Sequence, residues 1–340
     1  MSKIGSGIAR SGTSGDHERV FPGSTPAGLR RQVAAAVCLS AAFAVAVSAH
    51  AQVRVVASIK PVHSLVSAVM DGAGEPELII QGATSPHTFS LRPSDARNIQ
   101  DAEVIFMIGD ALETSLAGSI DTLGRDARVV RLADTEGLIR LPLREGATFE
   151  DHDHDHEEEG DHGEHEEEAF DMHIWLDPVN ARTMVRAIAN TLSTADADNA
   201  ATYAANAEAV TGRLDELLDQ INAGVDPVRG RAFIVFHDAY HYFEDRFELI
   251  AAGSASVSPD RPPGARRITE LRERVSDLGV VCVLAEPQFD PRLANVIIEG
   301  TSARLGTVDP LGAVLDSGPD MYFMLMQEMA ASFTDCLSEA

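Results

Sequence analysis

The stretch "NAATYAANAEAVTGRLDELLDQI" (199–221) organises this sequence. Its apolar residues keep helical spacing for more than twenty residues, which predicts a long helix. Short apolar runs typical of buried strands lie on both sides of it, four before and four after. The segments between these runs suit crossover helices, so each set of four predicts a parallel sheet covered by helices. The runs lie at 53–59, 77–82, 102–109, 128–133, 232–238, 247–253, 280–286 and 304–310.

The sequence therefore predicts an α/β protein with two lobes, each a parallel four-stranded sheet flanked by helices. A long helical segment that begins at Pro178, a residue suited to a helix N-terminus, joins them. Ligands of such sheets bind beyond the carboxyl ends of the strands, so we expect a site in the cleft between the lobes. The predicted parts are an N-terminal extension with a signal peptide (1–51), an N-terminal lobe (52–177), a bridging helical segment (178–224) and a C-terminal lobe (225–340).

The composition limits the possible partners. The chain has 340 residues, 44% of them hydrophobic, and a net charge of −26. These values fit a soluble globular protein with one large or two medium domains. The segment 150–168 contributes about twelve of the negative charges. Nucleic acids and anionic membrane surfaces are therefore poor partners.

The N-terminal segment has the pattern of a secretory signal. Arg30 and Arg31 precede "QVAAAVCLSAAFAVAVSAHA" (32–51), an apolar stretch that ends in a small-x-small cleavage pattern. We expect cleavage after about Ala51 and export to the periplasm. The alternative is a signal anchor, but the apolar stretch of about 17 residues is short for a membrane span.

Cleavage would leave two cysteines, Cys282 in a strand-like run and Cys336 in a helix-like run near the C-terminus. In an exported protein two cysteines favour one disulfide, although two buried thiols are the alternative. A bond between them would join the last helix to a sheet.

The run "DHDHDHEEEGDHGEHEEE" (151–168) has five histidines, eleven acidic residues and no apolar residue. Because it cannot bury a core, it predicts a disordered loop. Imidazoles and carboxylates are metal ligands, so we interpret the loop as a set of weak, fast-exchanging metal sites that capture or sense the ion, and a solvated charge run is the alternative. Its histidines are His152, His154, His156, His162 and His165.

Three histidines outside that run lie where a site would form. His87 follows the second apolar run, His173 precedes the bridging segment, and His237 ends the first run of the second lobe. Asp309 ends that lobe's last run. Three imidazoles plus a carboxylate or a water form a tetrahedral zinc set, whereas harder octahedral metals would require more oxygen ligands.

Two further histidines have other interpretations. We interpret His63, in the first expected helix, as structural. His241 lies four residues after His237, so on a helix the two would share a face, and His241 is an alternative ligand.

Six short motifs follow one another along the chain in a specific order. They are "SIKPVHSLV" (58–66), "SPHTFSLRPSDA" (85–96), "DMHIWLDP" (171–178), "VFHDAYHYFE" (235–244), "LAEPQF" (284–289) and "GTVDPLG" (306–312).

With these motifs, residues 53–340 resemble the periplasmic zinc-binding component of bacterial ABC zinc importers. This group belongs to a cluster of metal receptors that also contains manganese receptors. The resemblance implies two α/β lobes joined by a rigid backbone helix, with Zn²⁺ bound between them. It also implies delivery of zinc to a membrane permease. We expect the protein to be a periplasmic monomer, with the permease's cytoplasmic ATPase and periplasmic zinc chaperones as further partners.

Carried over residue by residue, the resemblance makes His87, His173 and His237 the zinc ligands. Manganese receptors resemble a version with Glu at the position of His237. The cysteine pair also matches the disulfide of such receptors.

The fourth ligand is where this sequence departs from the pattern. Some zinc receptors use a Glu immediately before the first ligand histidine, but this chain has Pro86 there. The fourth position then falls to Asp309, which matches a metal-binding aspartate of the cluster, or to water. Glu286 is a weaker candidate.

Other functions remain as alternatives. A receptor for manganese or another divalent metal belongs to the same cluster, and some relatives have been described as adhesins. A secreted zinc enzyme is a rival class because three protein ligands and a water also form catalytic zinc sites. The chain has no H-E-x-x-H, G-x-S-x-G or P-loop motif, so we expect no enzyme.

Overall fold

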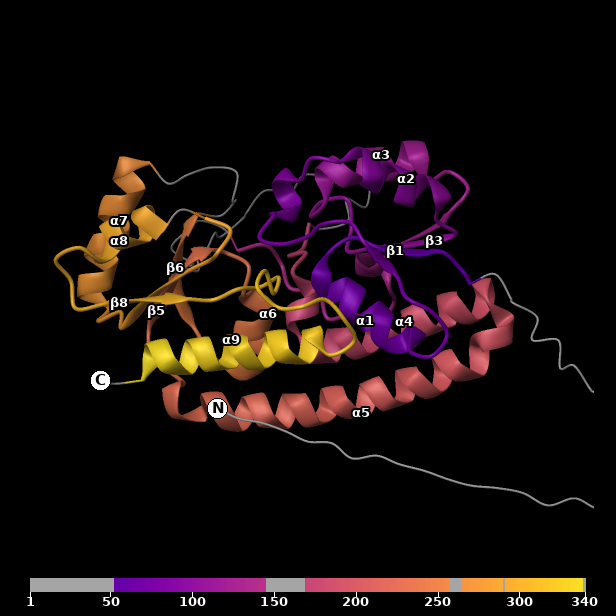
Figure 1. Ribbon diagram of the computed structural model, residues 1–340. Helices are drawn as coiled ribbons and strands as arrows, with labels where there is room; N and C mark the ends of the chain where they lie inside the picture. Colours follow the sequence, from indigo (N-terminus) through magenta and orange to yellow (C-terminus); the bar gives the residue numbers. More distant parts are fainter. Residues whose placement is uncertain (1–51, 145–168, 257–263, 290, 339–340) are drawn as a thin grey trace, which may run out of the picture. The chain divides into compact units, whose positions relative to one another are not determined.

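The computed structural model describes residues 52–144, 169–256, 264–289 and 291–338 (Figure 1). The predicted signal peptide (1–51) and the acidic loop (150–168) lie outside these residues. Among the described helices, none combines the length and the apolar character needed to cross a membrane.

The first sheet has four parallel strands in the order β2-β1-β3-β4. Its two central strands are rich in Val and Ile and fully buried, as expected for a sheet covered on both faces. The strands are β1 (Val55–Ala57), β2 (Glu77–Leu78), β3 (Val104–Met107) and β4 (Arg128–Arg131), and the helices between them are α1 (Lys60–Met70), α2 (Pro93–Asp101) and α3 (Thr114–Leu123).

The second sheet repeats this arrangement with the order β6-β5-β7-β8, again entirely parallel. The prediction of two lobes with parallel four-stranded sheets is therefore confirmed. The strands are β5 (Phe233–His237), β6 (Ala251–Ser256), β7 (Cys282–Ala285) and β8 (Arg304–Thr307), and the helices are α6 (His241–Phe247), α7 (Ala265–Asp277) and α8 (Pro291–Ile298).

Two helices form the connection between the lobes. The first, α4 (Pro178–Ala195), begins with a proline, and the Asp177 side chain accepts a hydrogen bond of 2.8 Å from the backbone N–H of Val179. After a short turn, α5 (Ala200–Val225) runs for 26 residues and packs along α4. The long helix predicted from residues 199–221 is confirmed.

The last helix, α9 (Met321–Leu337), packs against both α1 and α5 (Figure 1). Cys336 in this helix forms a disulfide with Cys282 in β7, with the two Cα atoms 5.8 Å apart. The predicted disulfide is confirmed, and it fastens the final helix to the second sheet.

One strand begins later than its apolar run predicts. The run at 247–253 predicts a strand, but Phe247 is the last residue of α6, and β6 begins at Ala251. Glu248 caps that helix with a left-handed φ of 56°, which ends the helix but does not fit a strand.

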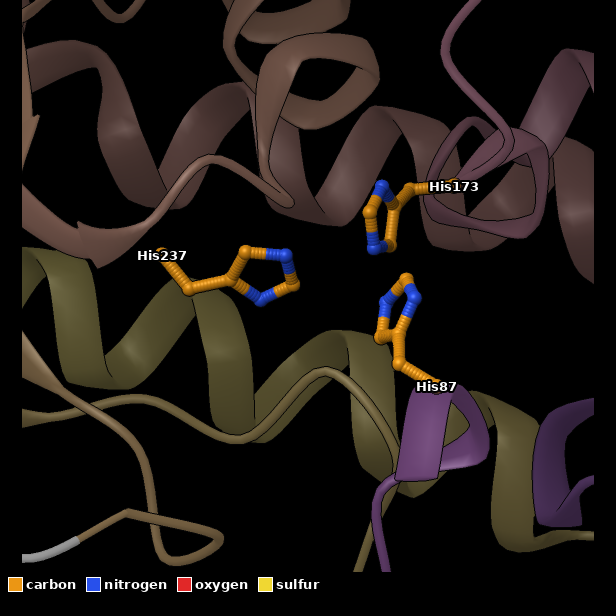
Figure 2. Close-up of side chains that lie close together, drawn as sticks. All are labelled: His87, His173 and His237. Atoms are coloured by element: carbon orange, nitrogen blue, oxygen red, sulfur yellow. The ribbon is translucent and has the colours of Figure 1, made fainter. Parts of the chain in front are cut away.

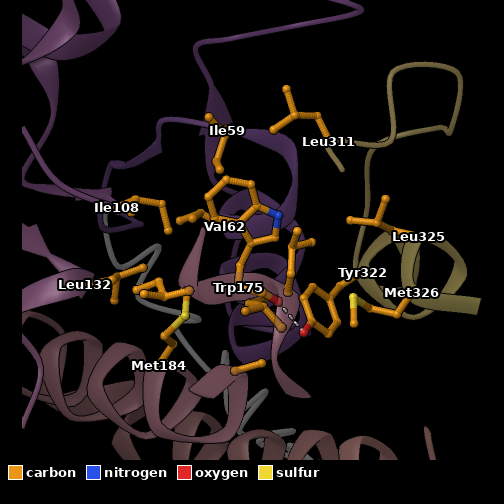
Figure 3. Close-up of a cluster of buried hydrophobic side chains, with 14 of the residues drawn as sticks. Ile59, Val62, Ile108, Leu132, Trp175, Met184, Leu311, Tyr322, Leu325 and Met326 are labelled. Atoms are coloured by element: carbon orange, nitrogen blue, oxygen red, sulfur yellow. Dashed lines mark hydrogen bonds between the residues drawn. The ribbon is translucent and has the colours of Figure 1, made fainter. Parts of the chain in front are cut away.

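A continuous hydrophobic core includes residues of both sheets and of α1, α4, α5 and α9. Trp175, the only tryptophan of the chain, lies in this core with 1% exposure (Figure 3). His50–Ala340 forms one compact unit. The residue bounds predicted for the separate lobes stay predictions.

Candidate metal centre

His87 lies in a short helical turn, Pro86–Thr88, that follows the first lobe's β2. Pro86 begins this turn, and the Ser85 hydroxyl accepts a hydrogen bond of 3.3 Å from the His87 backbone N–H. The Nε2 atom of His87 is buried and has no hydrogen-bond partner. A buried ring nitrogen without a partner is costly unless a ligand satisfies it.

His173 directly precedes the turn Ile174–Leu176, which leads into α4. Asp171 accepts two hydrogen bonds from this residue through Oδ1, at 2.9 Å from the backbone N–H and 2.6 Å from the ring Nδ1. A proton on Nδ1 leaves the lone pair of Nε2 free, so Asp171 sets the tautomer that a metal ligand needs.

His237 is the last residue of β5, and it is 5% exposed. Its Nδ1 lies 3.4 Å from Oε1 of Glu286, which follows the end of the neighbouring strand β7. Burial lowers the pKa of His237, but the charge of Glu286, with those of Asp238 and Asp171, outweighs burial and raises it.

The three imidazoles come from distant parts of the chain and face one another (Figure 2). One ligand atom from each of His87, His173 and His237 lies within 4.8 Å of the other two. The ring centroids are 5.1 to 5.9 Å apart. Within the described residues, this group contains the three histidines and neither Asp309 nor Glu286.

The pKa shifts of two of the rings differ in direction. Burial, and then the charges that His173 and His237 would carry, lower the pKa of His87 to about 3, which keeps that ring neutral with a free lone pair. The pKa of His237 is raised, so a metal ion competes with a proton at that ring. Three converging imidazoles are a donor set that suits zinc and other late divalent ions.

The space between the rings is small, with a volume of about 10 Å³. That is room for a single water-sized guest, such as one ion. The other side chains and loops around this space are Ser85, Pro86, Trp175, Glu286, Gln288, Phe289, Pro310 and Leu311.

Asp309 has a different set of partners from the one expected of a ligand. Its carboxylate accepts hydrogen bonds from Gln288 Nε2 at 2.9 Å, from the Leu311 N–H at 3.0 Å and from the Ala313 N–H. These contacts shape the loop after β8. The structure therefore gives no geometric support to Asp309 as the fourth ligand, and that role stays a prediction.

The other histidines lie outside the cluster. His63 in α1 is buried, and its Nε2 lies 3.0 Å from the Pro76 carbonyl oxygen, which fits the structural role expected for it. His241 is the first residue of α6 and is not part of the group. The five loop histidines fall outside the described residues.

Asp171 is the site residue that sequence reasoning missed. It lies two residues before a candidate ligand, and a carboxylate so close to a metal-binding histidine is a common partner of its second nitrogen. The "DMH" spacing was the available signal.

Comparisons with known proteins agree with this geometry. The family model described as "Zinc-uptake complex component A periplasmic" matches residues 55–336. The protein named high-affinity zinc uptake system protein ZnuA from Brucella suis is 47% identical over 314 residues, which cover 84% of this chain and 92% of that protein.

Solved structures show the same fold. A crystal structure of ZnuA superposes with a TM-score of 0.71 at 21% identity and covers 85% of this chain and all of that one. FpvC from Pseudomonas aeruginosa, solved in complex with Mn²⁺, has a TM-score of 0.71 at 18% identity, covering 84% of this chain and 99% of that one.

The family match spans most of the chain and includes the segments that carry all three histidines. It confirms the resemblance drawn from the six sequence motifs. The chain belongs to the family of periplasmic zinc-uptake component A proteins, named ZnuA.

Proposed function

We propose that this protein is a periplasmic receptor that binds one Zn²⁺ tightly and reversibly between His87, His173 and His237. One observation carries the proposal: the buried imidazoles of His173 and His237 and the half-buried imidazole of His87 converge, with one ligand atom of each within 4.8 Å of the others. Such a set would be unfavourable to bury without a ligand that accepts its lone pairs.

Zinc is favoured over manganese by the chemistry of the donors. Nitrogen ligands suit zinc, whereas manganese prefers carboxylate and water oxygens, and zinc stands above manganese in the general order of affinity. The relative with Mn²⁺ shares the fold at 18% identity, which supports no conclusion about the metal bound here.

We assign the fourth zinc position to a water molecule. The Asp309 carboxylate accepts hydrogen bonds from backbone N–H groups of the loop after β8. Glu286 lies beside Nδ1 of His237. Both carboxylates are then outer partners that orient the groups around the ion.

The protein then acts in transport and breaks no bond. The family description supports a role in a zinc-uptake complex, and we propose an ABC permease with its cytoplasmic ATPase as the partner. The matching family and relatives are described as zinc-uptake proteins, which weighs against a zinc enzyme. A monomeric state and contact with periplasmic zinc chaperones stay predictions.

The acidic loop is proposed to supply additional weak zinc sites. Imidazoles and carboxylates in the "DHDHDH" pattern are metal ligands without a preformed geometry, and their negative field concentrates cations. The loop would raise capture at scarce zinc without being the tight site.

Calorimetric titration of the metal-free protein with zinc tests this proposal. We expect one tight site, and we expect His237→Ala to weaken it by more than about 100-fold, beyond the usual effect of losing an outer partner. His241→Ala is the matched control because it removes an imidazole four residues away, outside the cluster, and it should leave the tight site unchanged.

Deleting residues 150–168 separates the two kinds of site. We expect the weak sites to disappear and the tight one to remain. If the tight site disappears with the loop, or if the two histidine variants lose affinity equally, the three-histidine assignment is wrong.

A further inference from the structure

Lys60 has an unusual position for a lysine. It is one of only two lysines in the sequence, the other being Lys3, and it is the first residue of α1. Its side chain is buried, with 7% of the residue exposed. A buried ammonium group is costly unless all its protons are donated, so its partners define its role.

All three donors of Lys60 go to one loop of the other lobe. Nζ donates to the carbonyl oxygens of Gly312 at 2.8 Å, Ala313 at 3.1 Å and Leu315 at 2.6 Å. These residues belong to the segment that connects β8 to α9, which we call the 309–315 loop. One charged side chain of the first lobe therefore holds this loop of the second lobe by three hydrogen bonds.

The opposite side of the 309–315 loop forms a wall of the metal centre. Pro310 and Leu311 line the space around the three imidazoles. The Pro310 carbonyl oxygen accepts a hydrogen bond of 2.9 Å from Nε1 of Trp175, which lines the same space. Figure 3 shows Leu311 beside Trp175 and Ile59, the residue that precedes Lys60.

Hydrogen bonds within the 309–315 loop connect the Lys60 contact with the wall of the metal centre. The Asp309 carboxylate accepts hydrogen bonds from the N–H groups of Leu311 and Ala313. Ala313 accepts a hydrogen bond from Lys60 and Leu311 lines the metal centre, so we expect a change at one to reach the other.

We propose that Lys60 is a positioning residue for zinc retention: it holds the 309–315 loop against the three-histidine cluster and thereby slows the release of zinc. This inference rests on the proposed zinc-binding function. Release then requires the three hydrogen bonds of Lys60 to break. The coupling is reciprocal. If the hydrogen bonds of Lys60 to the 309–315 loop raise the affinity for zinc by some factor, bound zinc must favour the hydrogen-bonded state of the loop by the same factor.

The first test compares zinc dissociation rates, measured with a chelator in excess, for the full-length wild-type protein and Lys60→Met. The methionine keeps an apolar stem and removes the three donors. We expect dissociation to accelerate roughly tenfold or more, since hydrogen bonds from charged groups are the strong ones. We expect association to change much less.

Ser64→Ala is the matched control. Ser64 also lies on α1, and its hydroxyl accepts a hydrogen bond of 2.9 Å from the Tyr322 N–H at the start of α9, but it does not touch the 309–315 loop. This variant loses a bond between the same two parts of the protein, so it should release zinc at the wild-type rate. An equal acceleration in both variants would show a general loss of packing and overturn the proposal.

The second test needs no substitution. Acetylation of the wild-type protein by an amine-reactive reagent, followed by mass spectrometry, reports how accessible the Lys60 amine is, with the N-terminal amine of the same chain as the internal reference. We expect zinc to slow acetylation of Lys60 by roughly tenfold relative to that N-terminal amine. An unchanged ratio would overturn the proposal even if Lys60→Met failed to fold.

Failure of the proposed zinc-binding function and failure of the proposed role of Lys60 give different results. If the wild-type protein binds no zinc tightly, the proposed function fails. If the wild-type protein binds zinc tightly but Lys60→Met releases it at the wild-type rate, only the role of Lys60 fails.

Discussion

Glu113 shows how a single buried carboxyl group affects the first lobe. Its side chain is fully buried just before α3, and it accepts hydrogen bonds from the N–H groups of Ile108 at 3.3 Å and Gly109 at 2.9 Å, beyond the end of β3. Burial raises its pKa to about 7, although these hydrogen bonds act in the opposite direction. The protonated form is therefore favoured in the folded protein.

The stability of the protein should depend on pH through this residue. Because the folded pKa lies above the unfolded one, the contribution is fully present below about pH 4.5 and is lost as pH rises through about 7. The change is on the order of 3 kcal/mol. Urea unfolding of the wild-type protein and Glu113→Gln should give a difference in free energy that shrinks by this order over that range. A difference that stays constant with pH would contradict the raised pKa.

The sequence identifies the three histidines because each follows a strand or precedes a helix, where side chains of α/β proteins converge. It does not identify Lys60, because its role depends on carbonyl groups about 250 residues further along the chain. The role of Asp309 stays a prediction. Its position after β8 suits a ligand, and the structure adds that its carboxylate accepts hydrogen bonds from N–H groups of its own loop, which no sequence pattern showed.

At the scale of elements, the packing of β8 depends on a glycine at position 306. A Cβ atom at Gly306 would lie 2.6 Å from the Cys336 sulfur and 2.8 Å from the Leu284 side chain. The disulfide and the neighbouring strand β7 therefore occupy the space that any larger residue would need.

Gly306→Ala should destabilise the protein by about 1–3 kcal/mol, the usual effect of overpacking. Gly118→Ala is the control, because Gly118 lies in α3 with no atom within 4 Å of the added methyl group. That change should stabilise by about 0.5–1 kcal/mol through helix propensity. Urea unfolding of both variants measures the two effects, and destabilisation of similar size in both would contradict the packing argument.

The eight strands of the described residues all lie at or next to the apolar runs, because runs of Val, Ile and Leu between turn residues are the strongest local signal. β6 begins later than predicted because Phe247 is the last residue of the preceding helix, α6. An apolar residue at the boundary between a helix and a strand can be buried as part of either element, so tertiary packing decides to which of the two it belongs.

At the scale of the whole molecule, the larger of the two hydrophobic clusters among the described residues joins both lobes, and the smaller one lies within the second lobe. Trp175 lies at this junction. Its indole N–H binds the Pro310 carbonyl oxygen, and its own carbonyl oxygen accepts a hydrogen bond of 2.7 Å from the Tyr322 hydroxyl (Figure 3). Residues of the second lobe thus hold the central tryptophan of the first.

We expect the metal-free protein to unfold in one cooperative transition. Fluorescence of the single tryptophan reports the junction between the lobes, and far-ultraviolet circular dichroism reports the helices and strands. Their midpoints in urea should coincide, because neither lobe can lose its part of the common core alone. Two separate transitions would show that the lobes are independent.

The packing of α9 on α1 also constrains how the chain can fold as it is made. A polypeptide emerges from the ribosome with its N-terminal part first. Here α1 is covered by α9, and Ser64 pairs with Tyr322, which lies 258 residues further along the chain. The first lobe therefore cannot reach its final form until α9 has been synthesised. A prematurely terminated chain would expose the apolar face of α1, which marks it for chaperones and proteases and keeps incomplete receptors from accumulating.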